Sequence, residues 1–162
     1  MTVIIDVIND SCAAALPSAE QLQQWSDTVS GHLPPSSKPV TVGLRIVDAD
    51  EGEQINQQYR GRDYATNVLS FGSELPDVVL DTLDEIPLGD LVICAPVVER
   101  EATEQGKPLP AHWAHMLVHG LLHLHGFDHE VDEQASVMEA LETRILTEMG
   151  FDDPYRHDNH TH

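Results

Sequence analysis

The stretch LPAHWAHMLVHGLLHLHGFDHE, residues 109–130, decides the fold of this 162-residue chain. Pro110 suits the first turn of a helix, where its missing N–H costs nothing, and Gly126 suits the turn that ends one. One broad face of the predicted helix carries Trp113, Met116, Leu117, Gly120, Leu121 and Leu124. Because Val118 and Leu122 fill most of the remaining surface, the helix is apolar nearly all round and is expected to run through the core.

The segments around this helix predict an α+β fold. Short β-branched runs predict strands at 2–8, 40–48, 67–71 and 88–95, and amphipathic or polar runs predict helices at 18–32, from about 48 to 61, and at 96–105. Ser18 is the expected N-cap of the first helix. A last helix is expected to start with Asp132 as its cap and to turn Met138, Leu141, Ile145 and Met149 inward.

The predicted architecture is a single domain over residues 1–152, with a small mixed four-stranded sheet, about five helices and a metal site on a central buried helix. The acidic, proline-flanked segment 74–87 is expected to be a loop. Residues 153–162 form a polar, histidine-containing tail that is expected to be flexible.

The charge balance limits the partners of the chain. Asp and Glu number 28 against 8 Lys and Arg, which gives a formal net charge of −20. Such a surface repels DNA, RNA and anionic membranes, so any action on nucleic acid must depend on a local basic site, a metal or a partner protein. The two cysteines, Cys12 and Cys94, are expected to be buried thiols. With no signal peptide and no membrane-spanning run, the sequence indicates a cytoplasmic protein.

Three histidines have the spacing of a metal site. His119 and His123 stand one helical turn apart, and His129 follows Gly126 in the pattern H-x-x-x-H-x-x-G-x-x-H. Two histidines four residues apart on a helix are often coincidental, but a third one after a glycine at this distance favours a site. Three imidazoles suit zinc and leave a fourth coordination position open, as catalytic sites require.

Other histidines near this motif are expected to play lesser parts. His112 and His115 lie on the same side of the predicted helix as His119 and His123, and the four form a histidine stripe. Nothing after His112 and His115 in the sequence completes a second metal site. They are interpreted as lining a cleft or as hydrogen-bonding behind the metal ligands, while His125 points off the stripe and is expected to be structural.

The residue after the first histidine excludes the usual peptidase mechanism. Zinc peptidases with this spacing place a glutamate there as general base and acid, whereas this chain has Gly120. A phosphodiester instead requires a cation near its non-bridging oxygens and help for the departing alkoxide. The run YRGRDYATNVLSF, residues 59–71, offers Arg60 and Arg62 for this purpose, although composition alone favours a role in offsetting acidic neighbours.

These residues together resemble a known family. Residues 59–71, LGDLVIC at 88–94 and HGLLHLHGFDH at 119–129 are similar to the YbeY-type endoribonucleases, which are bacterial zinc-dependent proteins of ribosomal RNA maturation. The similarity covers roughly residues 45–150 in the same order. One departure is Gly72, which follows NVLSF where the family usually has proline.

The resemblance implies a zinc-dependent, single-strand-specific endoribonuclease that processes the 3′ end of the small-subunit ribosomal RNA and acts in ribosome quality control. It makes His119, His123 and His129 the metal ligands and Arg60 the arginine that faces the metal, so Arg60 and His119 are the residues expected to be required for catalysis. Asp128 could orient a ligand imidazole or serve only the turn.

Two alternatives to this nuclease remain. One is a non-catalytic, zinc-containing ribosome-assembly factor whose acidic surface binds a basic ribosomal protein on the small subunit. The other, disfavoured by Gly120, is a zinc peptidase.

Overall fold

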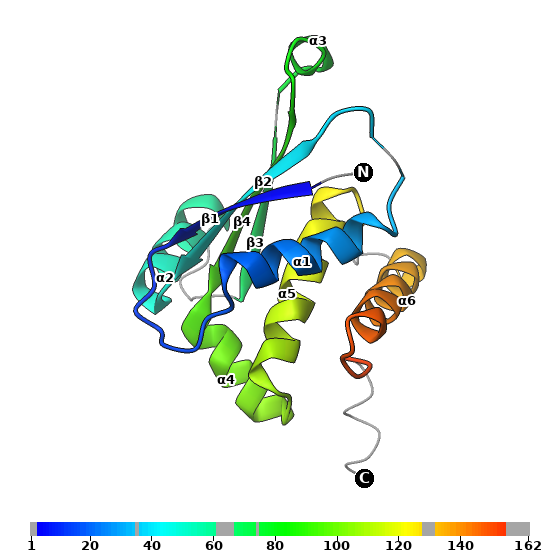
Figure 1. Ribbon diagram of the computed structural model, residues 1–162. Coiled ribbons are helices and arrows are strands. Elements are labelled where there is room, and N and C mark those ends of the chain that lie inside the picture. Colours follow the sequence, from blue (N-terminus) through cyan, green and yellow to red (C-terminus); the bar gives the residue numbers. More distant parts are fainter. Residues whose placement is uncertain (1–2, 35, 61–66, 74, 128–131, 155–162) are drawn as a thin grey trace.

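The structure contains one mixed four-stranded sheet, with helices packed against it (Figure 1). This computed structural model describes residues 3–34, 36–60, 67–73, 75–127 and 132–154, without the side chains of Tyr59, Arg60 and Asp132. The strands are β1 (Val3–Asn9), β2 (Val40–Val47), β3 (Val68–Gly72) and β4 (Ile86–Cys94), in the order β1-β2-β4-β3. β1, β2 and β4 are parallel and β3 is antiparallel to β4, which confirms the predicted sheet.

The described residues contain six helices where about five were expected. They are α1 (Ala19–Ser30), α2 (Ala49–Arg60), α3 (Asp77–Leu80), α4 (Ala95–Gln105), α5 (Leu109–Leu124) and α6 (Asp132–Glu148). The additional helix, α3, is a single turn inside the segment predicted to be a loop, and β4 also begins within that segment. The turn forms because the backbone N–H groups of Val79 and Leu80 both donate to the carbonyl of Pro76.

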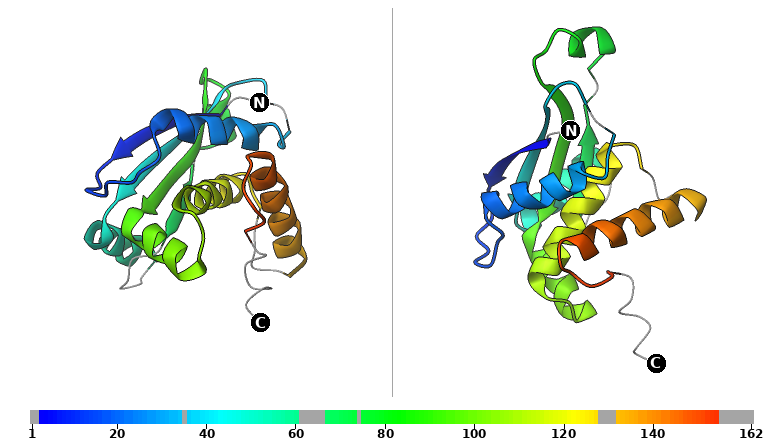
Figure 2. Two further views of the ribbon diagram at one scale, coloured as in Figure 1. Left: turned by 60° about the horizontal axis from the view of Figure 1, so that its bottom comes forward. Right: turned by 45° about the vertical axis from the view of Figure 1, so that its right-hand side comes forward.

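The core lies between one face of the sheet and the helices α1 and α5. Alternate residues of β2 point into this layer and are buried, namely Val40, Val42, Leu44 and Ile46. α5 contacts β3, β4 and the helices α1, α4 and α6, so it occupies the centre of the molecule (Figure 2). Its large side chains Trp113, Leu117 and Leu121 are almost fully buried, and each contributes about 1.5–3 kcal/mol of hydrophobic stabilisation. The prediction of a helix running through the core is confirmed.

The ends of the helices follow the predicted signals closely. Ser18 caps α1, since its Oγ accepts a hydrogen bond from the backbone N–H of Gln21 at 3.1 Å. Pro110 lies in the first turn of α5, as expected. The same helix ends at Leu124, and Gly126 follows in a left-handed conformation with φ of 98°.

The inward face of α6 contains positions that the prediction did not include. The four predicted residues do face inward: Met138 and Ile145 are buried, and Leu141 and Met149 are partly buried and pack against the core. The positions that complete the buried face are Glu142 and Leu146, each about 1% exposed. The prediction followed the apolar residues alone, so it missed an acidic residue at a buried position.

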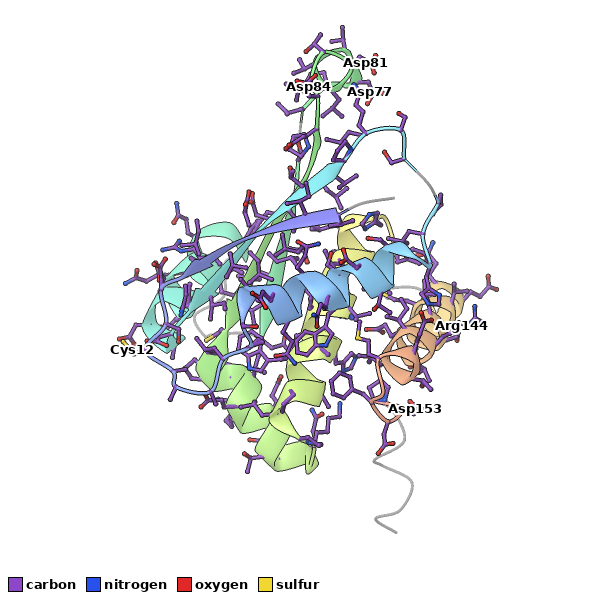
Figure 3. All side chains as sticks on the ribbon, viewed as in Figure 1. Cys12, Asp77, Asp81, Asp84, Arg144 and Asp153 are labelled. Atoms are coloured by element: carbon purple, nitrogen blue, oxygen red, sulfur yellow. The ribbon has the colours of Figure 1, made fainter. Side chains whose placement is uncertain are left out.

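The two cysteines have different environments. Cys94, at the end of β4, is 1% exposed, and burial raises the pKa of its thiol. Cys12 is exposed, so the expectation that it is buried was wrong (Figure 3). It lies between β1 and α1, where its backbone N–H donates to a carboxylate oxygen of Asp48 at 3.0 Å. Both thiols are free.

The described chain continues past the last helix as far as Pro154. Asp153 accepts a hydrogen bond from Thr143 at 3.3 Å, and Pro154 is buried. The rest of the predicted tail, residues 155–162, lies outside the described residues. None of the helices in the described residues has the length and apolar character needed to cross a membrane.

A matched pair of glycines tests the packing of β3 on β4. Gly72 and Gly89 are cross-strand partners, but a Cβ at Gly89 would lie 2.3 Å from the backbone oxygen of Phe71, whereas nothing lies within 4 Å of a Cβ at Gly72. We expect Gly89→Ala to lower the free energy of unfolding by about 2–4 kcal/mol and Gly72→Ala to change it by less than about 0.5 kcal/mol. Chemical denaturation of both variants would measure this, and equal effects would contradict the strand pairing.

Candidate active site

Two of the three predicted metal ligands lie on the exposed edge of α5. The side chain of His119 is 26% exposed, and His123, one turn further on, is exposed. The third predicted ligand, His129, lies outside the described residues, as do Asp128 and Arg62. Arg60 is the last residue of α2, and its side chain is not described. The structure therefore places one helical pair of the predicted site.

Glu142 of α6 is the site residue that the sequence interpretation missed. Its Oε2 lies 3.0 Å from Nδ1 of His119 and 3.3 Å from Nε2 of His115, so one carboxylate oxygen contacts two turns of α5. Glutamate is seldom fully buried unless it is paired. The signal was available in the sequence, because Glu142 is an acidic residue on an otherwise apolar stripe with Met138 and Ile145.

His115 lies between the exposed edge of α5 and the core. Its side chain is only 9% exposed, and its ring stands nearly perpendicular to that of His119, with centroids 6.5 Å apart. Burial lowers the pKa of His115, while the hydrogen bond and charge of Glu142 raise it to a smaller extent. A neutral imidazole can still donate one hydrogen bond to a carboxylate.

A second carboxylate contacts the same histidine stripe at its inner end. Nε2 of the buried His112 lies 3.0 Å from Oε1 of Glu101 on α4, and Nδ2 of Asn67 donates to the same oxygen at 3.0 Å. Burial raises the pKa of Glu101, but the hydrogen bonds from His112 and Asn67 outweigh it, and the pKa is lowered. This cluster joins α5, α4 and the chain entering β3.

The residues present fit a metal held by imidazoles. A metal-ligating histidine commonly donates its second ring N–H to a carboxylate, which fixes the tautomer and the ring orientation. The contact between Nδ1 of His119 and Glu142 has this form and leaves Nε2 of His119 as the atom that would face a metal. Within the described ranges, no three His, Cys, Asp or Glu side chains are arranged so that they could hold a metal ion, and the third predicted ligand, His129, lies outside those ranges.

Gly120 is required by packing. It is buried where α5 crosses β4, and a Cβ there would lie 2.8 Å from Cδ2 and 3.1 Å from Cδ1 of Leu91. Leu91 is itself fully buried, so it has little room to move. A glutamate at this position would run into the sheet, and the peptidase arrangement is therefore closed to this chain on steric grounds as well as chemical ones.

His125 ends α5 and takes part in its cap. Its Nδ1 lies 2.7 Å from the carbonyl oxygen of Leu121, to which it donates a hydrogen bond. His125 thus contacts the helix that carries the site, in line with the structural role expected for it.

The chain matches known proteins over most of its length. The family model described as Endoribonuclease YbeY matches residues 8–150. A protein named Endoribonuclease YbeY from Cellvibrio japonicus is 53% identical over 152 residues, covering 93% of this chain and 82% of the relative. Its namesake from Stenotrophomonas maltophilia is also 53% identical, over 142 residues, covering 88% of this chain and 86% of the relative.

A solved structure shares the fold. The solution structure of a Thermotoga maritima protein has a TM-score of 0.56 and 25% identity to this chain, and the match covers 93% of this chain and 98% of the other. The α+β arrangement around one central helix is therefore shared with an experimentally determined structure.

Introducing the glutamate of zinc peptidases at position 120 is expected to destabilise the fold and to give no peptidase activity. We expect Gly120→Glu to lower the free energy of unfolding by more than about 3 kcal/mol, because it forces an unpaired carboxylate against Leu91. Thermal unfolding and a casein-cleavage assay would measure both effects. Peptidase activity in a stably folded Gly120→Glu protein would contradict the packing argument.

Proposed function

Because the chain belongs to the YbeY endoribonuclease family, we propose that it is a zinc-dependent enzyme that cuts single-stranded RNA at the 3′ end of the small-subunit ribosomal RNA. The endoribonuclease activity follows from the family. The zinc, the strand preference, the ribosomal substrate and a part in ribosome quality control are the proposal. The observation that carries it is the contact of His119 with Glu142, which is the arrangement of a metal-ligating histidine.

We assign the metal to His119 and His123, with His129 as third ligand. When bound, a divalent ion would supply a Lewis acid and positive charge beside the phosphodiester. Arg60 would pair its guanidinium with the phosphate oxygens and stabilise the negative charge that builds on phosphorus. The buried end of the stripe, from His115 inward, would keep water away from the far side of the ligand rings.

The acidic surface of the protein favours binding to a basic protein of the small ribosomal subunit. The segment from β3 through α3 to β4 projects from the body of the molecule, and its tip carries Asp77, Asp81 and Asp84 (Figures 1 and 3). Large apolar side chains are exposed on the same projection, with Val78 71% and Leu75 42% exposed. An exposed apolar patch among carboxylates suits a basic protein surface and repels bare RNA.

The projecting tip is held in a defined position. Nζ of Lys38 donates hydrogen bonds to the carbonyl oxygens of Leu80 and Asp81, each at 3.2 Å, at the end of α3. These bonds connect the end of α3 to the chain that precedes β2.

The roles proposed for the metal ligands and for Arg60 can be distinguished by measuring zinc content and cleavage of a single-stranded RNA. This RNA has the sequence of the 3′ end of the small-subunit ribosomal RNA. We expect His119→Ala and His123→Ala to lose both bound zinc and cleavage, because each removes a ligand. Arg60→Ala is expected to keep its zinc and to cut about 100-fold more slowly, because only charge stabilisation is lost. Zinc content by atomic absorption and cleavage by gel would be measured on the same samples.

Arg144→Ala is the matched control, since Arg144 is an exposed arginine on α6 (Figure 3). It should retain both zinc and activity. Wild-type protein that carries one zinc, binds the small subunit and leaves the RNA intact would favour the non-catalytic assembly factor. Peptide cleavage that His119→Ala abolishes would favour a peptidase.

Neutralising the tip is expected to weaken binding to the small subunit without affecting cleavage of free RNA. We expect the triple variant Asp77→Asn, Asp81→Asn, Asp84→Asn to bind purified small subunits about tenfold more weakly, because interfacial charges contribute a few tenths to about 1 kcal/mol each. Sedimentation with subunits would measure the change.

An equal change of charge elsewhere serves as control for the tip. Glu20→Gln, Glu53→Gln and Glu139→Gln together remove three exposed carboxylates from α1, α2 and α6. This control variant should bind as the wild type does. If both triple variants bound small subunits equally weakly, binding would depend on the total charge of the protein and not on the tip.

A further inference from the structure

Glu142 is a buried acidic residue whose side chain is 1% exposed. Burying a carboxylate is costly unless hydrogen bonds and charge compensate for the lost water, so a single apolar side chain would fill this position in α6 at lower cost. Its neighbours on the same stripe, Met138 and Ile145, are apolar. The acidic group therefore needs an explanation beyond packing.

The contacts of Glu142 point toward the metal-binding edge of α5. Two histidines of α5 contact the same oxygen of Glu142, Oε2, which lies 3.0 Å from Nδ1 of His119 and 3.3 Å from Nε2 of His115. An ionised carboxylate only accepts hydrogen bonds, so His119 must carry its proton on Nδ1 when this bond forms. The unprotonated nitrogen of His119 is then Nε2, the form that a metal requires.

The same hydrogen bond limits the rotation of the ring. The χ2 torsion of histidine has broad minima, so a helix alone does not determine where Nε2 points. Anchoring Nδ1 to a carboxylate on a second helix selects one orientation. His115 contacts the same oxygen from inside the core.

We propose that Glu142 is a positioning residue for the metal ligand His119, and that His115 holds Glu142 in place. This inference rests on the metal site proposed above. It gives the buried His115 a part in the site without making it a ligand, and it assigns to α6 the task of orienting a side chain of α5.

The test measures zinc affinity and the tautomer of His119 in Glu142→Met and Glu142→Gln. Met fills a similar volume without an acceptor, and Gln keeps a neutral acceptor. We expect Glu142→Met to bind zinc about 10–100-fold more weakly in competition with a chromogenic chelator, and Glu142→Gln to fall between it and the wild type. In the metal-free protein, ¹⁵N NMR should show His119 protonated on Nδ1 in the wild type and shifted toward the Nε2-protonated form in Glu142→Met.

Glu139→Met and Glu139→Gln are the matched controls, because Glu139 is exposed on the same helix one turn earlier. They should leave zinc affinity and tautomer unchanged. If Glu142→Met does not fold, the charge-removing Glu142→Gln still tests the proposal through the tautomer and the chelator competition.

The outcomes distinguish this proposal from the metal site on which it rests. Wild-type zinc affinity retained in folded Glu142 variants, or Nε2-protonated His119 in the wild type, would overturn the positioning role and leave the metal site standing. Loss of thermal stability with unchanged affinity would show a structural role only. A wild type that binds no zinc would overturn both.

Discussion

The close contact of α5 with β4 governs the rest of the structure. At Gly120 the helix approaches the sheet so nearly that a single Cβ would collide with Leu91. This approach buries the face of α5 toward the sheet and leaves its other edge for polar side chains. His119 and His123 lie on that edge, so the packing that stabilises the core also determines where the predicted metal ligands emerge. A protein interior is close-packed, and a change at Gly120 would therefore move the site together with the helix.

Two carboxylates from different elements contact the histidine stripe of α5. Glu101 of α4 contacts His112 at the inner end, and Glu142 of α6 contacts His115 and His119 toward the surface. Each carboxylate joins a helix to α5 through directional hydrogen bonds, whereas the surrounding apolar contacts have no preferred direction. The stripe thus combines a role in the fold with a role in the site.

Much of the fold could be predicted from the sequence, because its signals are local. Ser18, Pro110 and Gly126 act within one turn of themselves, and the alternation along β2 reports directly which face is buried. The α3 turn was missed because Pro76 initiates it within an acidic run that looks like a loop. The prediction that Cys12 is buried was wrong, because amino-acid composition does not indicate where in the fold a cysteine lies. The spacing of His119 and His123 likewise follows from helix geometry. The carboxylate that contacts His119 lies 23 residues later on another helix. Its acidic character on an apolar stripe is a local signal that it is paired, but no local pattern says with which residue.

The position of Glu142 after His119 in the sequence has a consequence for biosynthesis. A ribosome makes the segment that bears His119 and His123 before it makes the helix that orients His119. The contact between Glu142 and His119 can form only after residue 142 has been added. A truncated product that ends before α6 would therefore carry His119 and His123 without the carboxylate that we propose orients His119.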